Sequence, residues 1–189
     1  MNANAKRLAV IAGLTLVASP ALAHTGGDVS GFHSGFFHPI LGLDHLMAML
    51  AVGVWSAVQP PCLAWRGPAV FVAMLAFGAV LGMGGMPMPF VEPGILASVV
   101  ILGLMVAGAR LLPASAGLVA IAGFALVHGH AHGTEAAGTL AAYMTGFTAA
   151  SALLHVAGYG AGRLVTGTRF GMFASGLAIA AGGLVLISG

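Results

Sequence analysis

Apolar residues run through this chain in seven stretches, separated by short groups of Pro, Gly and charged residues. The first stretch, near the N-terminus, is short. Each of the other six is close to the roughly 20 residues that a helix needs to cross the hydrocarbon of a bilayer. These six stretches are residues 38–58, 67–85, 93–112, 113–133, 136–159 and 169–188. The pattern predicts an all-α membrane protein whose residues 38–189 form a six-helix transmembrane bundle.

The N-terminus has the three parts of a secretory signal peptide. A Lys–Arg pair precedes the short apolar stretch, and Ala21 and Ala23 occupy the A-x-A positions of a cleavage site. We therefore predict a cleaved signal peptide at residues 1–23 and an outer polar tail at residues 24–37. An uncleaved N-terminal anchor is the alternative, although this stretch is shorter than the roughly 20 residues that span a membrane.

The arginines predict the orientation of the chain in the membrane. Cleavage of the signal peptide leaves the mature N-terminus outside, so the loops after the first, third and fifth spans are cytoplasmic. All four mature arginines lie at those loops, and the loops after the second and fourth spans contain no Lys or Arg. This distribution follows the positive-inside rule. We therefore predict a multi-pass membrane protein with both mature termini outside, which in a bacterial inner membrane is the periplasmic side.

The composition argues against a soluble enzyme. Charged residues make up 5% of the chain and hydrophobic residues 59%, whereas a soluble domain has about 25% charged residues. The single cysteine, Cys62, can form neither an internal disulfide nor a thiolate metal cage. The mature chain has equal numbers of arginines and acidic residues, so its charge gives no reason to expect a nucleic-acid partner.

The first polar cluster lies at the start of the first predicted span and contains His38, Asp44 and His45. Pro39 suits the first turn of a helix, which places His38 at the outer mouth of the span. His45 follows seven residues later, about 10 Å deeper and on nearly the same helix face. An aspartate inside a membrane normally faces a partner, a cavity or an ion path. The cluster therefore predicts a functional site.

The second polar cluster, H-G-H-A-H-G-T-E, lies at the outer end of the fourth predicted span. His128 and His132 are one turn apart on one helix face, and Glu135 continues that stripe if the helix persists. His130 points roughly the opposite way and is a weaker candidate. The two glycines of the cluster are expected to loosen the helix.

The predicted topology places both clusters at one depth, in the outer half of the membrane. Imidazole and carboxylate together suit borderline divalent ions such as nickel, cobalt, zinc or copper(II). His155 is a weaker candidate as an exit ligand, with a packing role equally open. A free N-terminal His24 could chelate metal, or belong to a tail without a role. The alternative for all these histidines is hydrogen bonding between helices. The predicted ligands are His38, Asp44, His45, His128, His132 and Glu135.

The two motifs together, H-x5-D-H and H-G-H-A-H-G-T-E, resemble the HupE/UreJ family of bacterial membrane proteins, and the resemblance covers essentially the whole chain. It implies a secondary nickel permease, with cobalt carried by some members, that supplies hydrogenase or urease maturation. It also marks the same six ligands. The residues alone indicate only a borderline divalent metal, so the choice of nickel comes from the resemblance.

The sequence lacks the motifs that two other classes of function require. The chain has no nucleotide-binding loop of the Walker type and no H-E-x-x-H motif, so we predict neither ATP hydrolysis nor a zincin-type protease. We expect no prosthetic group; the partners are the divalent metal and the lipid bilayer, and a homo-oligomer is one option. The alternative function is a haem-binding or other metal-binding membrane accessory protein without transport. Histidines would be the axial ligands of a haem, and a metal-sensing or scaffold protein of a larger complex is the other form of this alternative.

Overall fold

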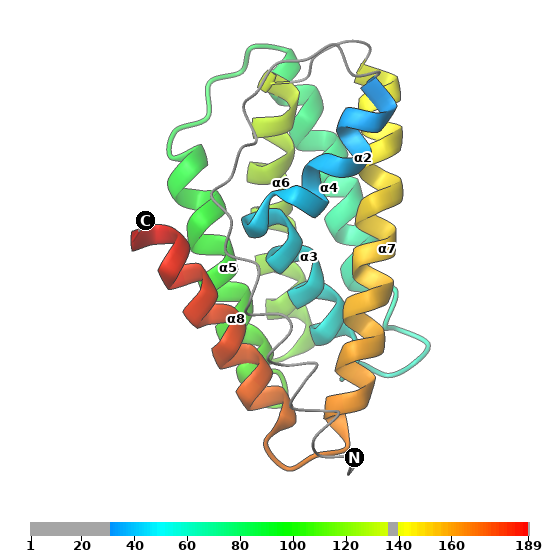
Figure 1. Ribbon diagram of the computed structural model, residues 1–189, viewed down its shortest axis with the longest axis vertical. Coiled ribbons are helices and arrows are strands. Elements are labelled where there is room, and N and C mark those ends of the chain that lie inside the picture. Colours follow the sequence, from blue (N-terminus) through cyan, green and yellow to red (C-terminus); the bar gives the residue numbers. More distant parts are fainter. Residues whose placement is uncertain (1–30, 136–139, 189) are drawn as a thin grey trace.

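The computed structural model describes residues 31–135 and 140–188. For Glu135 and Leu140, which flank the gap between the two ranges, it describes the backbone but not the side chains. The predicted signal peptide, residues 24–30 of the predicted tail and His24 lie outside this part of the chain. Residues 31–37, the rest of that tail, are helical. Within the described ranges the chain is all-helical, with no strand (Figure 1).

The described residues form seven helices, two of which are the halves of one bent pair. They are α2 (Gly31–Leu41), α3 (Leu43–Ser56), α4 (Arg66–Met83), α5 (Val91–Ala107), α6 (Ala114–Glu135), α7 (Leu140–Thr166) and α8 (Gly171–Ser188). Three of them, α4, α6 and α8, are long and apolar enough to cross a membrane, and the bent pair α2–α3 is a fourth if its halves form one span. The six predicted segments overlap these helices, and six crossings remain a prediction.

Large apolar side chains cover the outside of the helices. Val119, Val156 and Val185 are each about two-thirds or more exposed. Such a surface is unfavourable in water but suits contact with lipid chains, because helices satisfy their own backbone hydrogen bonds there. The exposed apolar faces therefore agree with a membrane protein.

The first predicted span is broken at the position of its polar cluster. The helix α2 contains Pro39 and ends at Leu41, and α3 then begins at Leu43 at an angle of 76° to it. Pro39 lacks an N–H donor and crowds the preceding turn, and Gly42 has the extended backbone that separates the two helices. The prediction that His38 and His45 share one helix face was therefore wrong, because they lie on two helices.

Glycines bring the helices together in pairs. The closest pairs are α4 with α6, α5 with α8, and α7 with both α2 and α3. Gly129 and Gly133 of α6 lie directly against the backbone carbonyls of Leu75 and Ala79 in α4, where a Cβ atom has no room. These two glycines were predicted to loosen the helix, which was wrong: α6 remains helical through both, because α4 packs against them. Small residues at such contacts let helices approach closely in lipid.

The arginines gather at one end of the bundle, which we call the arginine end. Arg66 begins α4 beside the last residues of α3. Arg110, in the turn after α5, donates from Nη2 to the carbonyl oxygen of Thr166 in α7, at 3.0 Å. Arg163 lies in the last turn of α7. The opposite end, where α6 ends and α2 and α7 begin, is the histidine end.

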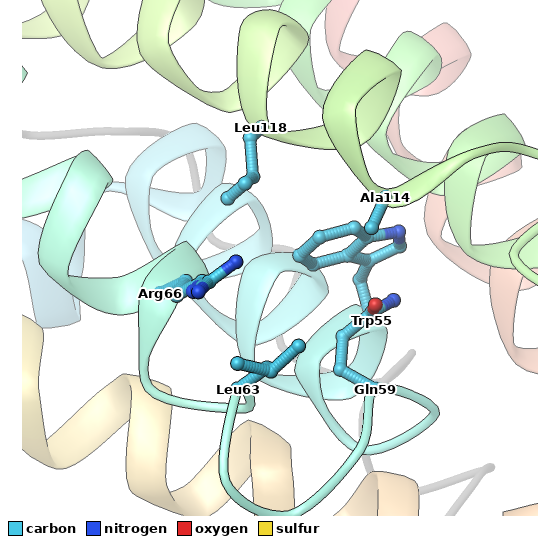
Figure 2. Close-up of a pocket in the computed structure, with 6 residues that line it drawn as sticks. All are labelled: Trp55, Gln59, Leu63, Arg66, Ala114 and Leu118. Carbon is cyan, nitrogen blue, oxygen red and sulfur yellow. The ribbon is translucent and has the colours of Figure 1, made fainter.

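A small pocket lies at the arginine end, where α3, α4 and α6 meet (Figure 2). Its volume is about 20 Å³, which holds about one water molecule. The guanidinium of Arg66 lines it and repels cations, so this pocket is a poor candidate for a metal site. The residues around it are Trp55, Gln59, Leu63, Arg66, Ala114 and Leu118.

Candidate metal centre

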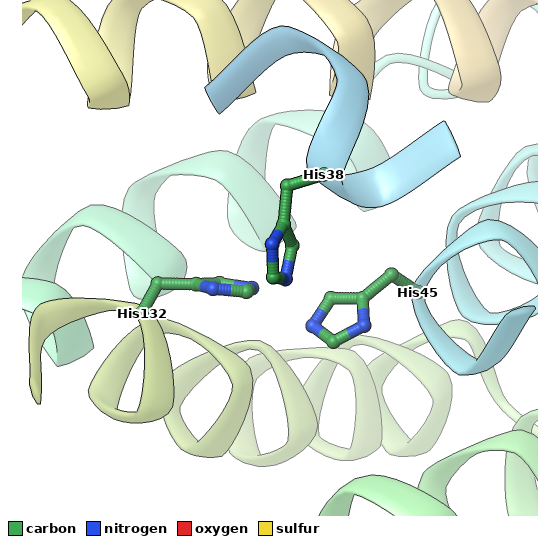
Figure 3. Close-up of side chains that lie close together, drawn as sticks. All are labelled: His38, His45 and His132. Atoms are coloured by element: carbon green, nitrogen blue, oxygen red, sulfur yellow. The ribbon is translucent and has the colours of Figure 1, made fainter. Parts of the chain in front are cut away.

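Three imidazoles from three helices meet at the break between α2 and α3. His38 comes from α2, His45 from α3 and His132 from α6, and their rings converge (Figure 3). One ring nitrogen from each lies within 4.8 Å of the other two. The ring centroid of His132 is 4.6 Å from that of His38 and 4.6 Å from that of His45. We call these three residues the histidine trio.

Two members of the trio have a buried ring nitrogen with no partner. His45 and His132 are 6% and 1% exposed, and Nε2 of each lacks a hydrogen bond. Buried polar atoms almost always have a partner. Two such nitrogens in one cluster therefore indicate a site that is completed by something the protein binds.

The other ring nitrogen of each of these histidines is held by a neighbouring side chain. His45 Nδ1 lies 2.7 Å from Asp44 Oδ1, which also accepts the backbone N–H of His45 at 2.8 Å. His132 Nδ1 lies 3.3 Å from the hydroxyl of Tyr143 in α7. A carboxylate at Nδ1 keeps the proton there and leaves Nε2 of His45 as a lone-pair donor, which is how metal-binding histidines are usually oriented. Asp44 was predicted as a ligand, and the structure places it on the Nδ1 side of His45.

His128 adjoins the trio one turn deeper in α6. Its side chain is fully buried, and its ring centroid is 4.7 Å from that of His45. Ser98 Oγ donates to the Ile95 carbonyl at 2.6 Å and so accepts from His128 Nε2 at 2.9 Å. The proton is therefore on Nε2, and Nδ1, which is buried without a partner, carries the lone pair.

The remaining candidates lie apart from the trio. His130 Nε2 donates to the carbonyl oxygen of Met86, at 2.7 Å, and so ties α6 to the loop after α4. His155 lies deeper, on α7, with its ring centroid 5.1 Å from that of Phe71. The side chain of Glu135 is outside the described residues, so its part in the site stays a prediction.

Two residues of α7 at the centre were not found from the sequence. Tyr143 bonds His132, and the Phe147 ring centroid is 4.4 Å from that of His132 and 6.4 Å from those of the other two members. Nothing in the sequence pairs the start of the fifth predicted span with the second polar cluster. Phe147 gives the trio an apolar wall, which limits the access of water to the site.

The arrangement suits a borderline divalent cation. Two nitrogens bound to one ion at about 2.1 Å are about 3–4 Å apart. The ligand nitrogens of the trio, which lie within 4.8 Å of one another, therefore need to approach by at most about 1–2 Å. Neutral imidazole nitrogens favour nickel, cobalt, zinc or copper(II) over magnesium or calcium. The break between α2 and α3 resembles the interrupted helices that build ion sites within membranes.

Comparison with known proteins identifies the family. The family model described as "HupE / UreJ protein" matches residues 12–186, nearly the whole chain. The chain belongs to the HupE/UreJ family. "Protein HupE" of Rhizobium leguminosarum bv. viciae is 38% identical over 180 residues, which cover 93% of this chain and 92% of the relative. No solved structure matches. In this HupE/UreJ chain, both motifs that carried the resemblance contribute to the trio.

Proposed function

We propose that this HupE/UreJ protein is a permease that moves a divalent transition metal across the bacterial inner membrane. Nickel is the expected cargo, with cobalt as the second choice, and hydrogenase or urease maturation is the expected destination. The convergence of three imidazoles from α2, α3 and α6 is the observation that supports this proposal most directly.

The proposed topology has six crossings, a signal peptide cleaved after Ala23, and both mature termini in the periplasm. The bent pair α2–α3 forms the first crossing, and α4 to α8 form the other five. The gathering of arginines at the end away from the trio supports this orientation, because arginine is retained on the cytoplasmic side. The trio then faces the periplasm and serves as the metal entrance.

The exposure of the histidines favours entry of the ion from the histidine end. His38 is half-buried, whereas His45 and His132 are buried and His128 is fully enclosed. Exposure therefore falls from His38 inward along a series of neighbouring rings. An ion that exchanges water for imidazole stepwise along this series avoids losing its whole hydration shell at once.

The alternative of a haem-binding accessory protein is less well supported by the geometry. The rings of the trio are in contact, with centroids 4.6 to 5.3 Å apart. A macrocycle held between two of these imidazoles would have to push those rings apart, and Phe147 packs against one of them.

The test is metal accumulation in cells that lack other nickel importers, measured by elemental analysis for nickel, cobalt, zinc and copper. We expect the wild-type chain to raise cellular nickel, and both His45→Ala and His132→Ala to abolish the increase. His33→Ala is the matched control, because His33 is exposed on α2 and, among the described rings, its ring contacts only that of Phe37. Nickel accumulation that both trio variants leave unchanged would refute the proposal.

A further inference from the structure

Another buried imidazole, outside both polar clusters, lies closer to the arginine end than the trio does. His155 of α7 is 2% exposed, and both of its ring nitrogens are buried with no hydrogen-bond partner. A neutral imidazole has one N–H donor and one lone pair. Burying both without partners is unfavourable, and native structures rarely do it without a reason. Packing alone would be served better by an apolar side chain.

A hydroxyl that is also buried without a hydrogen-bond partner lies one turn before His155. Ser151 is 1% exposed, and its Oγ atom has no partner either. Hydroxyls in helices commonly bond the carbonyl one turn earlier, as Thr145 of the same helix does with Ala141 at 2.6 Å. Ser151 does not make that bond. Because residues four apart share a helix face, Ser151 and His155 present two available polar groups side by side.

These two groups are at a different depth from the trio. The backbone of Gly53 in α3 lies directly against the carbonyl of His155. Gly53 follows His45 by eight residues in α3, which is about 12 Å along the helix axis. One aromatic ring connects the two levels: the Phe71 centroid is 6.3 Å from that of His128 and 5.1 Å from that of His155.

The helix α7 joins the two levels along one series of side chains. Tyr143, Phe147, Ser151 and His155 follow one another at four-residue intervals, and all four are buried. Tyr143 bonds His132 of the trio, and Phe147 packs on it. The series thus leads from the trio, past an apolar ring, to the hydroxyl and the imidazole.

We propose that His155 and Ser151 form a second metal-binding station, the inner station, on the way from the trio to the arginine end. This proposal rests on the proposed transport function and assigns the site that receives the ion after the trio. One imidazole and one hydroxyl, with water completing the shell, bind a borderline divalent ion more weakly than three imidazoles do. A weaker second station suits release, because conduction needs sites that an ion can leave. The Phe71 ring lies between His128, which adjoins the trio, and His155 of the inner station.

The test is uptake of radioactive nickel ion into liposomes that contain the full chain, with the wild type, His155→Leu, Ser151→Ala and Thr145→Ala compared. We expect His155→Leu to lower the maximal rate by at least about tenfold. Nickel affinity at the trio should stay within about twofold of the wild type. Ser151→Ala should lower the rate to an intermediate value. Thr145→Ala should transport normally, because its hydroxyl is exposed and bonds only its own helix.

Thermal unfolding of the same variants separates a lost station from a lost fold. Replacing an unpaired buried polar group with an apolar one of similar size is neutral or stabilising. His155→Leu should therefore unfold at the wild-type temperature or above it while it transports poorly. A leucine variant that transports like the wild type, or that is clearly less stable, would overturn the inner station. Absence of uptake by the wild-type chain would instead refute the proposed transport function.

A cysteine variant distinguishes metal contact from proton transfer at His155. Thiolate ligands favour zinc, so His155→Cys should raise the ratio of zinc to nickel uptake by at least about threefold. A group that only transfers protons does not contact the metal and leaves that ratio unchanged. An unchanged ratio would therefore contradict the inner station.

Discussion

Asp44 is expected to support nickel binding through His45. Its Oδ1 atom accepts the ring Nδ1–H of His45 at 2.7 Å and the backbone N–H of the same residue at 2.8 Å. Asp44→Ala removes both contacts and frees the ring to rotate or to change tautomer. Loss of such a partner typically lowers metal affinity by about 10–100-fold. The Asp44 side chain is 26% exposed, so water replaces part of its effect, and we expect about 10–30-fold, or about 1.4–2 kcal/mol.

The assay is calorimetric titration of the purified protein with nickel ion at fixed pH and salt. Asp44→Asn, which retains an oxygen acceptor without the charge, should lose less affinity than Asp44→Ala. Glu92→Ala is the matched control, because Glu92 is an exposed carboxylate in the first turn of α5. The reasoning is refuted if Asp44→Ala binds nickel like the wild type, or if Glu92→Ala weakens binding equally. A loss beyond about 1,000-fold would show instead that Asp44 is itself a ligand.

Three further predictions concern packing and the other histidines. Gly129→Ala should lower the thermal unfolding temperature in detergent, because the added Cβ atom meets the α4 backbone. Gly123→Ala is the control: the space around Gly123 is open, so this variant should leave the unfolding temperature unchanged or raise it slightly. Ser98→Ala leaves the buried Nε2–H of His128 without its acceptor and should destabilise the protein by about 1–3 kcal/mol, measured by denaturant unfolding. His130→Ala should free the loop at Met86, seen as faster proteolysis there, with nickel affinity unchanged; affinity lost as in His132→Ala would contradict this assignment.

The sequence predicted the helical class, the family and the two polar clusters, because each depends on residue types over short stretches. Apolar stretches, a histidine at His38 and a D-H pair at Asp44 and His45 are visible without any tertiary contact. The break at Gly42 was not predicted. Proline was assigned to a first turn, and the sequence does not show that α2 begins seven residues before His38.

The other features that the sequence did not predict depend on contacts between segments that are distant along the chain. Tyr143 and Phe147 enter the centre only because α7 packs on α2, which no local pattern shows. Gly129 and Gly133 were interpreted as weak points of α6, whereas their lack of side chains is what admits α4. In each case a contact between two helices determined the role of the residue, and the sequence of one helix does not reveal such a contact.

The most direct test of the trio is X-ray absorption at the nickel edge on the purified, nickel-loaded protein. We expect scattering from three imidazole ligands in the wild type and from fewer in His45→Ala, with nickel binding lost when His38, His45 and His132 are all replaced by alanine. Nickel bound with an unchanged imidazole shell in that triple variant would contradict the account.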